Sequence, residues 1–306
     1  MKLATIVNFC THDFRFFKKS IEAVSSFSDQ VIVPICDHFF NGELENLALI
    51  EKIYRDYPHV DFIEFAYDPE QLYGTFKHLL PESPEWGPQW HNSSRLVAFY
   101  FLKECIDSVL FCDVDEVVDQ KKFTEWLKNF DLTSYSALRF STYWYFREAS
   151  FQATTYPDGP LLVKKEALTS ELILNEDERM GLFLRIQGKK ERLFPGLDGR
   201  PMVHHYSWVR TREELLKKVT AWAHHWERDW KALIEEEYSR EFQGNDFVRK
   251  YAYQKVDPFF DPLVDEVPHY ASISLEQHSE NIKKFPHVRR VSAKEIFRKQ
   301  LLSNLK

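Results

Sequence analysis

The 306-residue chain is predicted to form an α/β fold, with a mostly parallel sheet sandwiched by helices. Short, continuously apolar segments alternate with segments whose apolar residues recur at helical spacing, as in strand–helix–strand units. Hydrophobic residues make up 44% of the chain and charged residues 28%. This balance excludes a disordered or fibrous protein and supplies enough apolar side chains for a large core.

Four predicted strands alternate with three predicted helices in the first part of the chain. The strands are apolar runs at residues 3–9, 31–36, 60–65 and 109–112. The helices carry apolar faces within residues 16–24, 44–54 and 93–106. A loop rich in proline and tryptophan, residues 69–90, precedes the third helix.

After Phe146 this alternation gives way to strands and loops. At Thr211 a capping box with Glu214 opens another helix. Its apolar face is expected to include three tryptophans, Trp222, Trp226 and Trp230. Such a stripe indicates core packing, or alternatively a wall on which a sugar stacks or a dimer seam.

Charge is distributed unevenly along the chain. The net charge is −7, but residues 281–306 carry +7 and everything before them −14. An acidic body disfavours a nucleic-acid partner, because phosphate binding needs clustered Lys and Arg. The basic tail has a short amphipathic pattern at residues 294–302, which predicts either peripheral contact with an anionic membrane or a solvated helix packed on the domain.

The four cysteines, Cys10, Cys36, Cys105 and Cys112, form no CxxC pair and indicate reduced thiols. No apolar run approaches the roughly 20 residues that cross a bilayer. The first seven residues are too short for a signal peptide and continue into the first strand. We therefore expect a cytoplasmic protein.

Acidic residues follow the predicted strands. Asp113-Val114-Asp115-Glu116 comes directly after the fourth strand, where alternation puts both aspartates on one side. Two such carboxylates suit Mg²⁺ or Mn²⁺, whose remaining positions can take diphosphate oxygens. Other polar residues end the earlier strands: Thr11 and Asp13, Asp37, and Asp68. Parallel strands place these ends at one ligand crevice.

Two segments carry a resemblance to a known family. Asn92-Ser93-Ser94-Arg95 with its helix, followed by the strand and acidic block at 109–116, resembles GT-A-fold glycosyltransferases of the inverting family-2-like group. The resemblance implies a metal-dependent transfer of sugar from a nucleoside-diphosphate sugar, UDP-sugar above all, to a glycan, lipid-linked or protein hydroxyl. It also implies Mn²⁺ or Mg²⁺ as cofactor, a catalytic domain at 1–210 (nucleotide-binding half 1–120, acceptor half 121–210) and a helical extension at 211–306.

The resemblance also implies a set of site residues. Those expected to bind the nucleotide are Asn8, Thr11, Asp13, Asp37, Arg95 and Asp113. Asp113 and Asp115 would hold the metal and the sugar-ribose part of the donor.

The segment Asn175-Glu176-Asp177-Glu178 resembles the Glu-Asp motif of the same family and lies 62 residues after Asp115. In that family its aspartate is the base for the acceptor, which makes Asp177, with Glu176, the predicted catalytic residues. An inverting transfer needs such a carboxylate to take the hydroxyl proton. The alternative is an acidic helix N-terminus stabilised by the helix dipole.

His204 and His205 lie in a predicted strand at 202–208. Adjacent strand residues face opposite sides, so only one of them can complete the metal site. The following Tyr206-Ser207-Trp208 resembles His-Tyr-x-Trp segments of metal-dependent transferases and favours His205. Either histidine could instead make a structural hydrogen bond.

Two other functions fit parts of the sequence. The block Asp113-Val114-Asp115-Glu116-Val117 also resembles the nucleophile motif of haloacid-dehalogenase phosphohydrolases, with Asp113 as nucleophile and Asp115 as acid/base. That motif normally opens a chain, whereas here three strand–helix units precede it. The aromatic content of 16% alone would also suit a non-enzymatic carbohydrate-binding protein.

Overall fold

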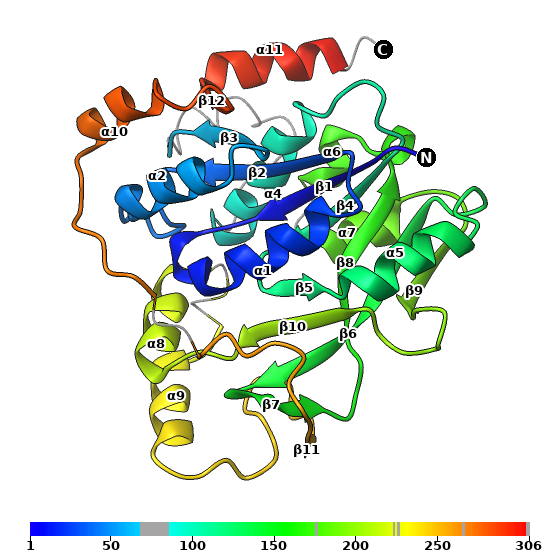
Figure 1. Ribbon diagram of the computed structural model, residues 1–306, viewed down its shortest axis with the longest axis vertical. Helices are drawn as coiled ribbons and strands as arrows, with labels where there is room; N and C mark the ends of the chain where they lie inside the picture. The colour runs from blue at the N-terminus through cyan, green and yellow to red at the C-terminus, as the bar shows by residue number, and fades with distance from the viewer. Residues whose placement is uncertain (68–85, 175–176, 223, 225–226, 265–266, 304–306) are drawn as a thin grey trace.

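The computed structural model describes residues 1–67, 86–174, 177–222, 224, 227–264 and 267–303. Within this part of the chain, twelve strands join in one sheet whose main path is β11-β7-β6-β8-β4-β1-β2-β3-β12. Figure 1 shows this sheet through the middle of the molecule with helices on either side. The predicted α/β fold class is confirmed.

The first half of the sheet is parallel, as predicted. Its strands are β1 (Leu3–Asn8), β2 (Gln30–Cys36), β3 (Asp61–Phe65), β4 (Ser108–Asp113) and β12 (Val288–Val291). β4 and β2 flank β1, and β3 and β12 continue the sheet beyond β2. Register pairs Asn8 with Asp113, so two predicted site residues lie side by side at the carboxyl ends of their strands.

The second half of the sheet is mixed. β8 pairs antiparallel with β4, and β6 pairs antiparallel with β8 and β7. These later strands are β5 (Glu116–Val118), β6 (Ala137–Phe146), β7 (Glu148–Ala153), β8 (Asp158–Lys164), β9 (Lys190–Phe194), β10 (Val203–Trp208) and β11 (Tyr253–Lys255). β10 and β9 each run parallel to β6, and β10 also pairs with β5. The mainly parallel character therefore belongs to the N-terminal half.

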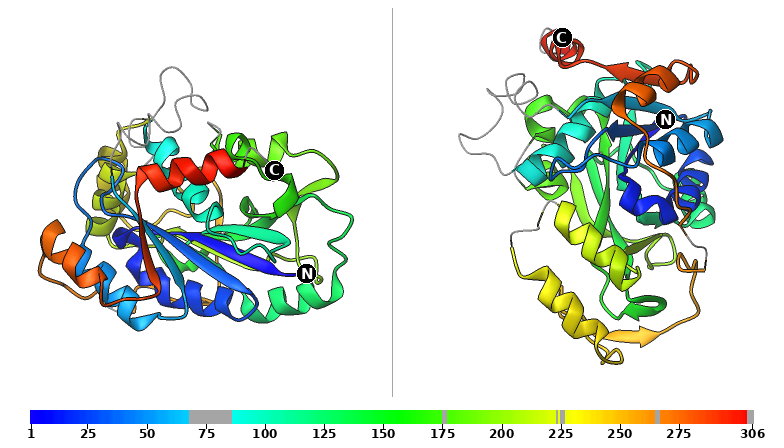
Figure 2. Two further views of the ribbon diagram at one scale, coloured as in Figure 1. Left: turned by 90° about the horizontal axis from the view of Figure 1, so that it is seen from above. Right: turned by 90° about the vertical axis from the view of Figure 1, so that its left-hand side faces the viewer.

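Helices cover both faces of the sheet, which is why the early strands are apolar on both sides. One face carries α1 (Phe14–Ser25), α2 (Leu47–Asp56) and α5 (Gln120–Asn129). The other carries α4 (Trp86–Phe99), α6 (Ser170–Ile173), α7 (Glu178–Arg185) and α11 (Ala293–Ser303). The right-hand view of Figure 2 shows α8 and α9 set apart from these layers.

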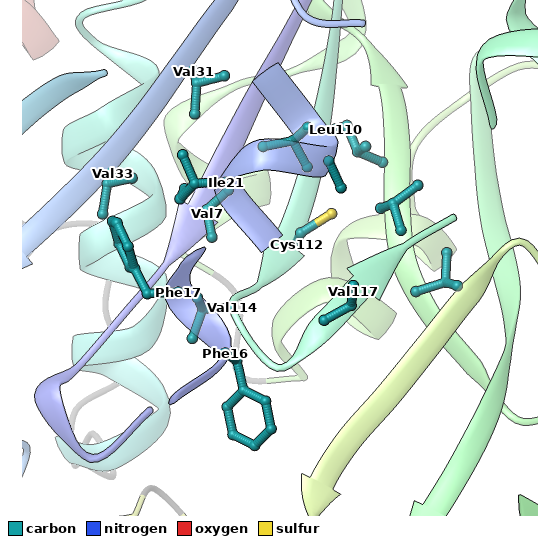
Figure 3. Close-up of a cluster of buried hydrophobic side chains, with 14 of the residues drawn as sticks. Val7, Phe16, Phe17, Ile21, Val31, Val33, Leu110, Cys112, Val114 and Val117 are labelled. Atoms are coloured by element: carbon teal, nitrogen blue, oxygen red, sulfur yellow. The ribbon is translucent and has the colours of Figure 1, made fainter. Parts of the chain in front are cut away.

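The core beneath α1 illustrates the packing. Val7 of β1 and Cys112 of β4 contribute to it, whereas Ile6 belongs to the cluster on the opposite face. Phe16 and Phe17 of α1 are essentially inaccessible to solvent, and Figure 3 shows them with the valines of β1 and β2. Burying each ring contributes about 1.5–3 kcal/mol, and this fixes α1 and the loop that follows β1.

The C-terminal part is not only helical. It contains α8 (Arg212–Ala221), α9 (Trp230–Tyr238) and α10 (Leu275–Ile282), but also β11 and β12, which pair with β7 and β3. The capping box of Thr211 and Glu214 that opens α8 is confirmed.

The prediction of one tryptophan-bearing helix is wrong. α8 ends at Ala221, Trp222 has extended backbone, and the side chain of Asp229 caps a second helix by accepting from the Ala232 amide. Trp226 lies outside the described residues. The rings of Trp222 and Trp230 still meet, with centroids 5.0 Å apart, and both pack against Trp208.

The basic tail forms β12 and α11. Ile296 is buried, and Lys299 donates a 2.9 Å hydrogen bond to the Tyr100 carbonyl while lying 4.3 Å from the ring centroid of Phe101. Phe297 on the other side is exposed. The helix is thus attached to the domain. In the described part of the chain, no helix has both the length and the apolar character needed to span a bilayer.

Candidate functional site

A cavity of about 690 Å³ lies at the carboxyl ends of β1 and β4. Its wall is completed by residues of β6, β8, β9 and β10, the start of α7 and the segments after α8 and α9. The predicted site residues that line it are Asn8, Asp13, Asp113, Asp115 and His205. The four cysteines are free, and Cys10 and Cys36 belong to the wall.

Three predicted nucleotide-binding residues, Thr11, Asp37 and Arg95, are not among the described residues that line the cavity, because other groups engage them. Thr11 is buried and donates from both its amide (3.1 Å) and its hydroxyl to Glu45. Asp37 is buried and accepts from the Tyr67 amide at 2.6 Å, with the His38 ring nitrogen at 2.7 Å. The side chains of Thr11 and Asp37 thus lie behind the cavity surface, where they hold the loops that form its wall.

Asp113 lies in a cluster of three cationic side chains. Arg95, fully enclosed in α4, places Nη2 at 3.2 Å from Asp113 Oδ1, and His91 Nε2 lies 3.4 Å from the same oxygen. Arg179 Nη2 donates to Oδ2 at 2.9 Å. Burial raises the pKa of Asp113, but Arg179 and His91 outweigh it and hold that pKa well below its usual range.

Glu178 joins the same cluster. Its Oε2 lies 3.0 Å from His91 Nδ1 and 3.3 Å from Arg95 Nη1, and its backbone φ is 48°, in the left-handed region. Such a conformation is costly for a residue with a side chain and is concentrated at functional sites. His91 thus bridges Glu178 and Asp113. Burial and Arg95 lower the pKa of His91, but the two carboxylates outweigh them and raise it.

Glu116, which follows the D-x-D pair, is completely buried. Arg179 Nη1 and Nη2 reach its two carboxylate oxygens at 2.5 and 2.9 Å, and its Oε2 accepts from the Asp113 amide at 2.8 Å. Such a bidentate pair is strong and directional. Arg179 therefore locks the start of α7 onto the acidic block after β4.

Asp115 has different partners. Lys218 Nζ of α8 lies 3.1 Å and Arg210 Nη2 3.4 Å from Oδ2, while His205 Nε2 lies 3.5 Å from Oδ1. Burial raises the pKa of Asp115, but Lys218 and His205 outweigh it and lower that pKa strongly. Arg210 also pairs with Asp13, and Lys218 receives a second partner in Ser207 Oγ at 3.1 Å.

The two adjacent histidines separate as strand residues must. His205 reaches the cavity, and its Nδ1 is buried with no hydrogen-bond partner among the described residues. His204 faces the other side, where Nδ1 lies 2.8 Å from the Tyr145 hydroxyl and its ring stacks on Phe259. Burial lowers the pKa of His204 to about 3, so it is neutral.

The donor set at Asp115 and His205 suits a divalent cation in part. One carboxylate oxygen and one imidazole nitrogen at 3.5 Å face the same cavity, and these ligand types match Mn²⁺ or Mg²⁺. Within the described ranges, no group of three His, Cys, Asp or Glu side chains is placed to hold a metal ion. A cation here would therefore take its remaining ligands from substrate oxygens or water.

The predicted base Asp177 and its neighbour Glu178 differ in their access to the cavity. Asp177 is exposed at the N-terminal boundary of α7 and is not among the described residues of the cavity wall, whereas Glu178 is part of that wall. Glu178 has left-handed backbone, and the next residue, Arg179, is bound to Glu116. Together these features turn the chain toward the cavity after Asp177. Glu176 lies outside the described residues.

One end of the cavity is lined by Asn8, His12, Phe39 and Glu45. Asn8 Oδ1 is buried without a hydrogen-bond partner in the described structure, and its Nδ2 donates to the His91 carbonyl at 3.4 Å. The rings of His12 and Phe39 stack with centroids 4.1 Å apart. Burial lowers the pKa of His12 to about 4 and raises that of Glu45 to about 8, so both are largely neutral at pH 7.

The other end of the cavity is aromatic and basic. Its aromatic residues are Trp144, Tyr156, Trp208, Trp222 and Tyr251. Rings of this kind form apolar platforms with polar edges, as carbohydrate sites do. Arg139, Asp158 and Arg192 lie on the same wall.

Several residues of the site escaped the sequence prediction: His91, Glu178, Arg179, Arg210 and Lys218. His91 adjoins the Asn92–Arg95 segment, and Glu178-Arg179 adjoins Asp177, so widening each motif by two residues would have found them. Lys218 carried no comparable signal, because a lysine in an amphipathic helix is usually solvated.

No protein-family model and no curated protein sequence matches this chain. Solved structures that resemble it include 4-diphosphocytidyl-2C-methyl-D-erythritol synthase from Anaerococcus prevotii, with a TM-score of 0.41, 11% identity and coverage of 72% of this chain and 95% of the other. For the glycosyltransferase GlyE of Streptococcus pneumoniae the TM-score is 0.37 and the identity 15%. The match covers 78% of this chain and 64% of GlyE, which is less than two thirds of GlyE. For Staphylococcus aureus TarS 1–349 the TM-score is 0.38 and the identity 12%, and the match covers 78% of this chain and 73% of the other.

Proposed function

We propose that this protein is a glycosyltransferase that moves a sugar from a nucleoside-diphosphate sugar, UDP-sugar first among them, to a hydroxyl acceptor. The observation that carries the proposal is the placement of Asp113 and Asp115 at the carboxyl end of β4, on the wall of one cavity with His205 and Lys218. A diphosphate seated there would meet the ammonium group of Lys218 and the imidazole of His205, both of which line the cavity.

Different parts of the cavity suit the base and the diphosphate of the donor. Asn8, with an amide oxygen that has no partner among the described residues, can accept from a base N–H. Lys218 on the opposite side of Asp115 supplies a positive charge toward the diphosphate. A divalent cation held by Asp115 and His205, with Asp113 beside them, would act as a Lewis acid that neutralises the departing diphosphate.

For the chemical step we propose inversion with Glu178 as base. The acceptor oxygen attacks the anomeric carbon, the bond from that carbon to the diphosphate oxygen breaks, and the hydroxyl proton passes to the carboxylate. His91 and Arg95 hold Glu178 in place. Although burial raises the pKa of Glu178, the neighbouring His91 and Arg95 charges lower it, so the carboxylate is ionised at neutral pH. A lowered pKa makes it a weak base, and the proton transfer is therefore driven by the acidity that the hydroxyl gains as its oxygen bonds to the anomeric carbon.

The test is calorimetric titration of UDP, with and without Mn²⁺, into the full chain and into Asp115→Asn. We expect Mn²⁺ to tighten UDP binding in the wild type and not in the variant. Transfer or hydrolysis of a UDP-sugar should fall by about 10²–10³-fold, as for loss of one preorganised electrostatic group. Asp56→Asn, which changes only a surface pair with Lys52, is the control. Equal UDP affinity in Asp115→Asn and wild type would contradict the proposal.

A phosphohydrolase with Asp113 as nucleophile is the competing function. The same carboxylate is held at both oxygens by Arg95, His91 and Arg179, which leaves little of it for attack on phosphorus. Release of phosphate from p-nitrophenyl phosphate that disappears in Asp113→Asn would favour this function. The carbohydrate-binding alternative predicts sugar binding without any affinity for UDP.

A further inference from the structure

At one corner of the cavity two guanidinium groups, those of Arg139 and Arg192, share one carboxylate at ion-pair distance. Arg139 of β6 and Arg192 of β9 are register partners on neighbouring parallel strands. Like charges in that arrangement repel each other and destabilise a sheet. β6, β8 and β9 lie side by side at this edge in Figure 1, and the acid available to both arginines is Asp158 of β8.

The pairing with Asp158 is incomplete. Arg192 makes a close ion pair with Asp158 Oδ2, whereas Arg139 Nε lies 3.3 Å from that same oxygen without forming a hydrogen bond. One carboxylate oxygen thus serves two guanidinium groups. Arg179, which also lines the cavity, is already matched by Glu116 and Asp113.

Arg139 is the unusual member of the corner. The residue is 9% exposed, lines the cavity, and has no hydrogen-bond partner for Nε or Nη1 among the described residues. A buried guanidinium without hydrogen bonds is expensive, because it has lost water and gained little in return. Burial and the nearby charge of Arg179 lower the pKa of Arg139 to about 10, which leaves it charged at neutral pH.

The strand that carries Arg192 is locally strained. Leu193 has a φ of 57°, its side chain is 48% exposed on the cavity wall, and the register with β6 shifts at this point. Positive φ in a branched residue costs on the order of 1–3 kcal/mol and is retained where function requires it. The bulge leaves Arg192 beside Arg139, with Tyr156 on the same wall.

We infer that Arg139 and Arg192 form a subsite for an anionic group on the acceptor sugar, a carboxylate or a phosphate. The inference rests on the proposed function in that it identifies the acceptor. Guanidinium groups bind both anions through paired N–H donors, and the aromatic residues nearby offer a face for the sugar ring. The anion would restore the charge balance that Asp158 alone does not provide.

The experiment compares glucuronate, glucose 6-phosphate and glucose as probes of the full chain by calorimetry, with and without UDP. We expect at least one anionic sugar to bind about tenfold or more tightly than glucose, a difference that should shrink at high salt. Arg139→Gln and Arg192→Gln should each remove the preference, and the two anions tell carboxylate from phosphate recognition. Arg192 is half exposed, so its variant tests the site even where Arg139→Gln fails to fold.

Arg185→Gln is the matched control, since this arginine is exposed on α7 and not among the described residues of the cavity wall. It should keep the preference, and UDP affinity should change less than twofold in Arg192→Gln. Equal affinity for all three sugars, or a preference that survives in Arg192→Gln, would overturn the subsite. A tenfold loss of UDP affinity in Arg192→Gln would also overturn it, because the arginines would then bind the donor and not the acceptor. Failure of UDP to bind while anionic sugars still bind would remove the proposed function and leave the subsite.

Discussion

Two histidines in this protein each bridge two carboxylates in nearly the same way. His91 lies between Asp113 (3.4 Å) and Glu178 (3.0 Å). His278 of α10 lies between Glu51 of α2 (2.9 Å) and Glu64 of β3 (3.0 Å). Both imidazoles have a raised pKa, because in each case the carboxylates outweigh the effect of burial.

The surroundings of the two bridges differ. His91 lines the cavity, and Arg95 and Arg179 neutralise its carboxylates independently of the imidazole. His278 is completely buried and connects α10 to α2 and β3. An acid–histidine–acid cluster is therefore not a catalytic signature by itself. Access to a cavity, and two guanidinium groups at the carboxylates where the His278 bridge has only Arg290 near Glu64 among the described residues, distinguish the candidate site from the structural bridge.

The largest effect that separates the two bridges should come from their carboxylates. Glu178→Gln should lower turnover of a UDP-sugar by about 10²–10⁴-fold with UDP affinity nearly intact, as for a lost general base. Glu51→Gln, at the other bridge, should leave turnover per folded molecule unchanged. Steady-state kinetics with a UDP-sugar donor measures both. Asp177→Asn serves as the neighbouring control, and a larger loss there than in Glu178→Gln would return the base to the residue that the sequence predicted.

The second effect is on stability. His278→Gln should lower the free energy of unfolding by about 3 kcal/mol, because Glu51 and the fully buried Glu64 lose their shared cation and only Arg290, 3.4 Å from Glu64 and partly exposed, remains among the described residues. His91→Gln should cost much less stability, since two arginines remain at its carboxylates, but should reduce turnover. Urea unfolding followed by fluorescence gives the comparison. Equal destabilisation by the two substitutions would show that access to the cavity does not separate the bridges.

The third effect concerns pH. A histidine whose pKa is raised in the folded state binds its proton more tightly there, so its stabilisation is complete below pH 6.5 and is lost as pH rises through the folded pKa. The stability difference between wild type and His278→Gln should therefore shrink above pH 6.5, by about 1.4 kcal/mol for each unit of pKa shift. Urea titrations at pH 6 and pH 9 test this, and a constant difference would speak against a protonated bridge.

The smallest effect is expected at the basic tail, which follows the helix that carries His278. Because Ile296 and Lys299 attach α11 to the domain, only its outer residues can meet a membrane. Lys294 and Arg298 are exposed there, each worth roughly 1 kcal/mol near an anionic surface. Neutralisation of both, Lys294→Gln with Arg298→Gln, should change sedimentation with anionic liposomes by at most about 30-fold at low salt. Strong wild-type binding at physiological salt would show that the tail is a membrane anchor.

The sequence predicted the local and periodic features of this protein. Continuous apolar strands with amphipathic helices between them required a sheet covered on both faces, and Asp113 and Asp115 had to lie at the end of β4. It also separated His204 from His205, because neighbouring strand residues point to opposite sides. These features depend on a few consecutive residues, and their spacing is visible in one dimension.

Only the tertiary structure decided which charges meet. Arg179 reaches Glu116 across 63 positions, Arg210 and Lys218 reach Asp115 across 95 and 103, and Arg139 and Arg192 share Asp158 through strand pairing. The position of Glu178 rather than Asp177 on the cavity wall depends on one backbone angle, and the break after Ala221 on a cap at Asp229. Electrostatic pairing depends on distance in space, which periodicity does not encode, and so the positive charge around the acidic motif emerges only when the chain is folded.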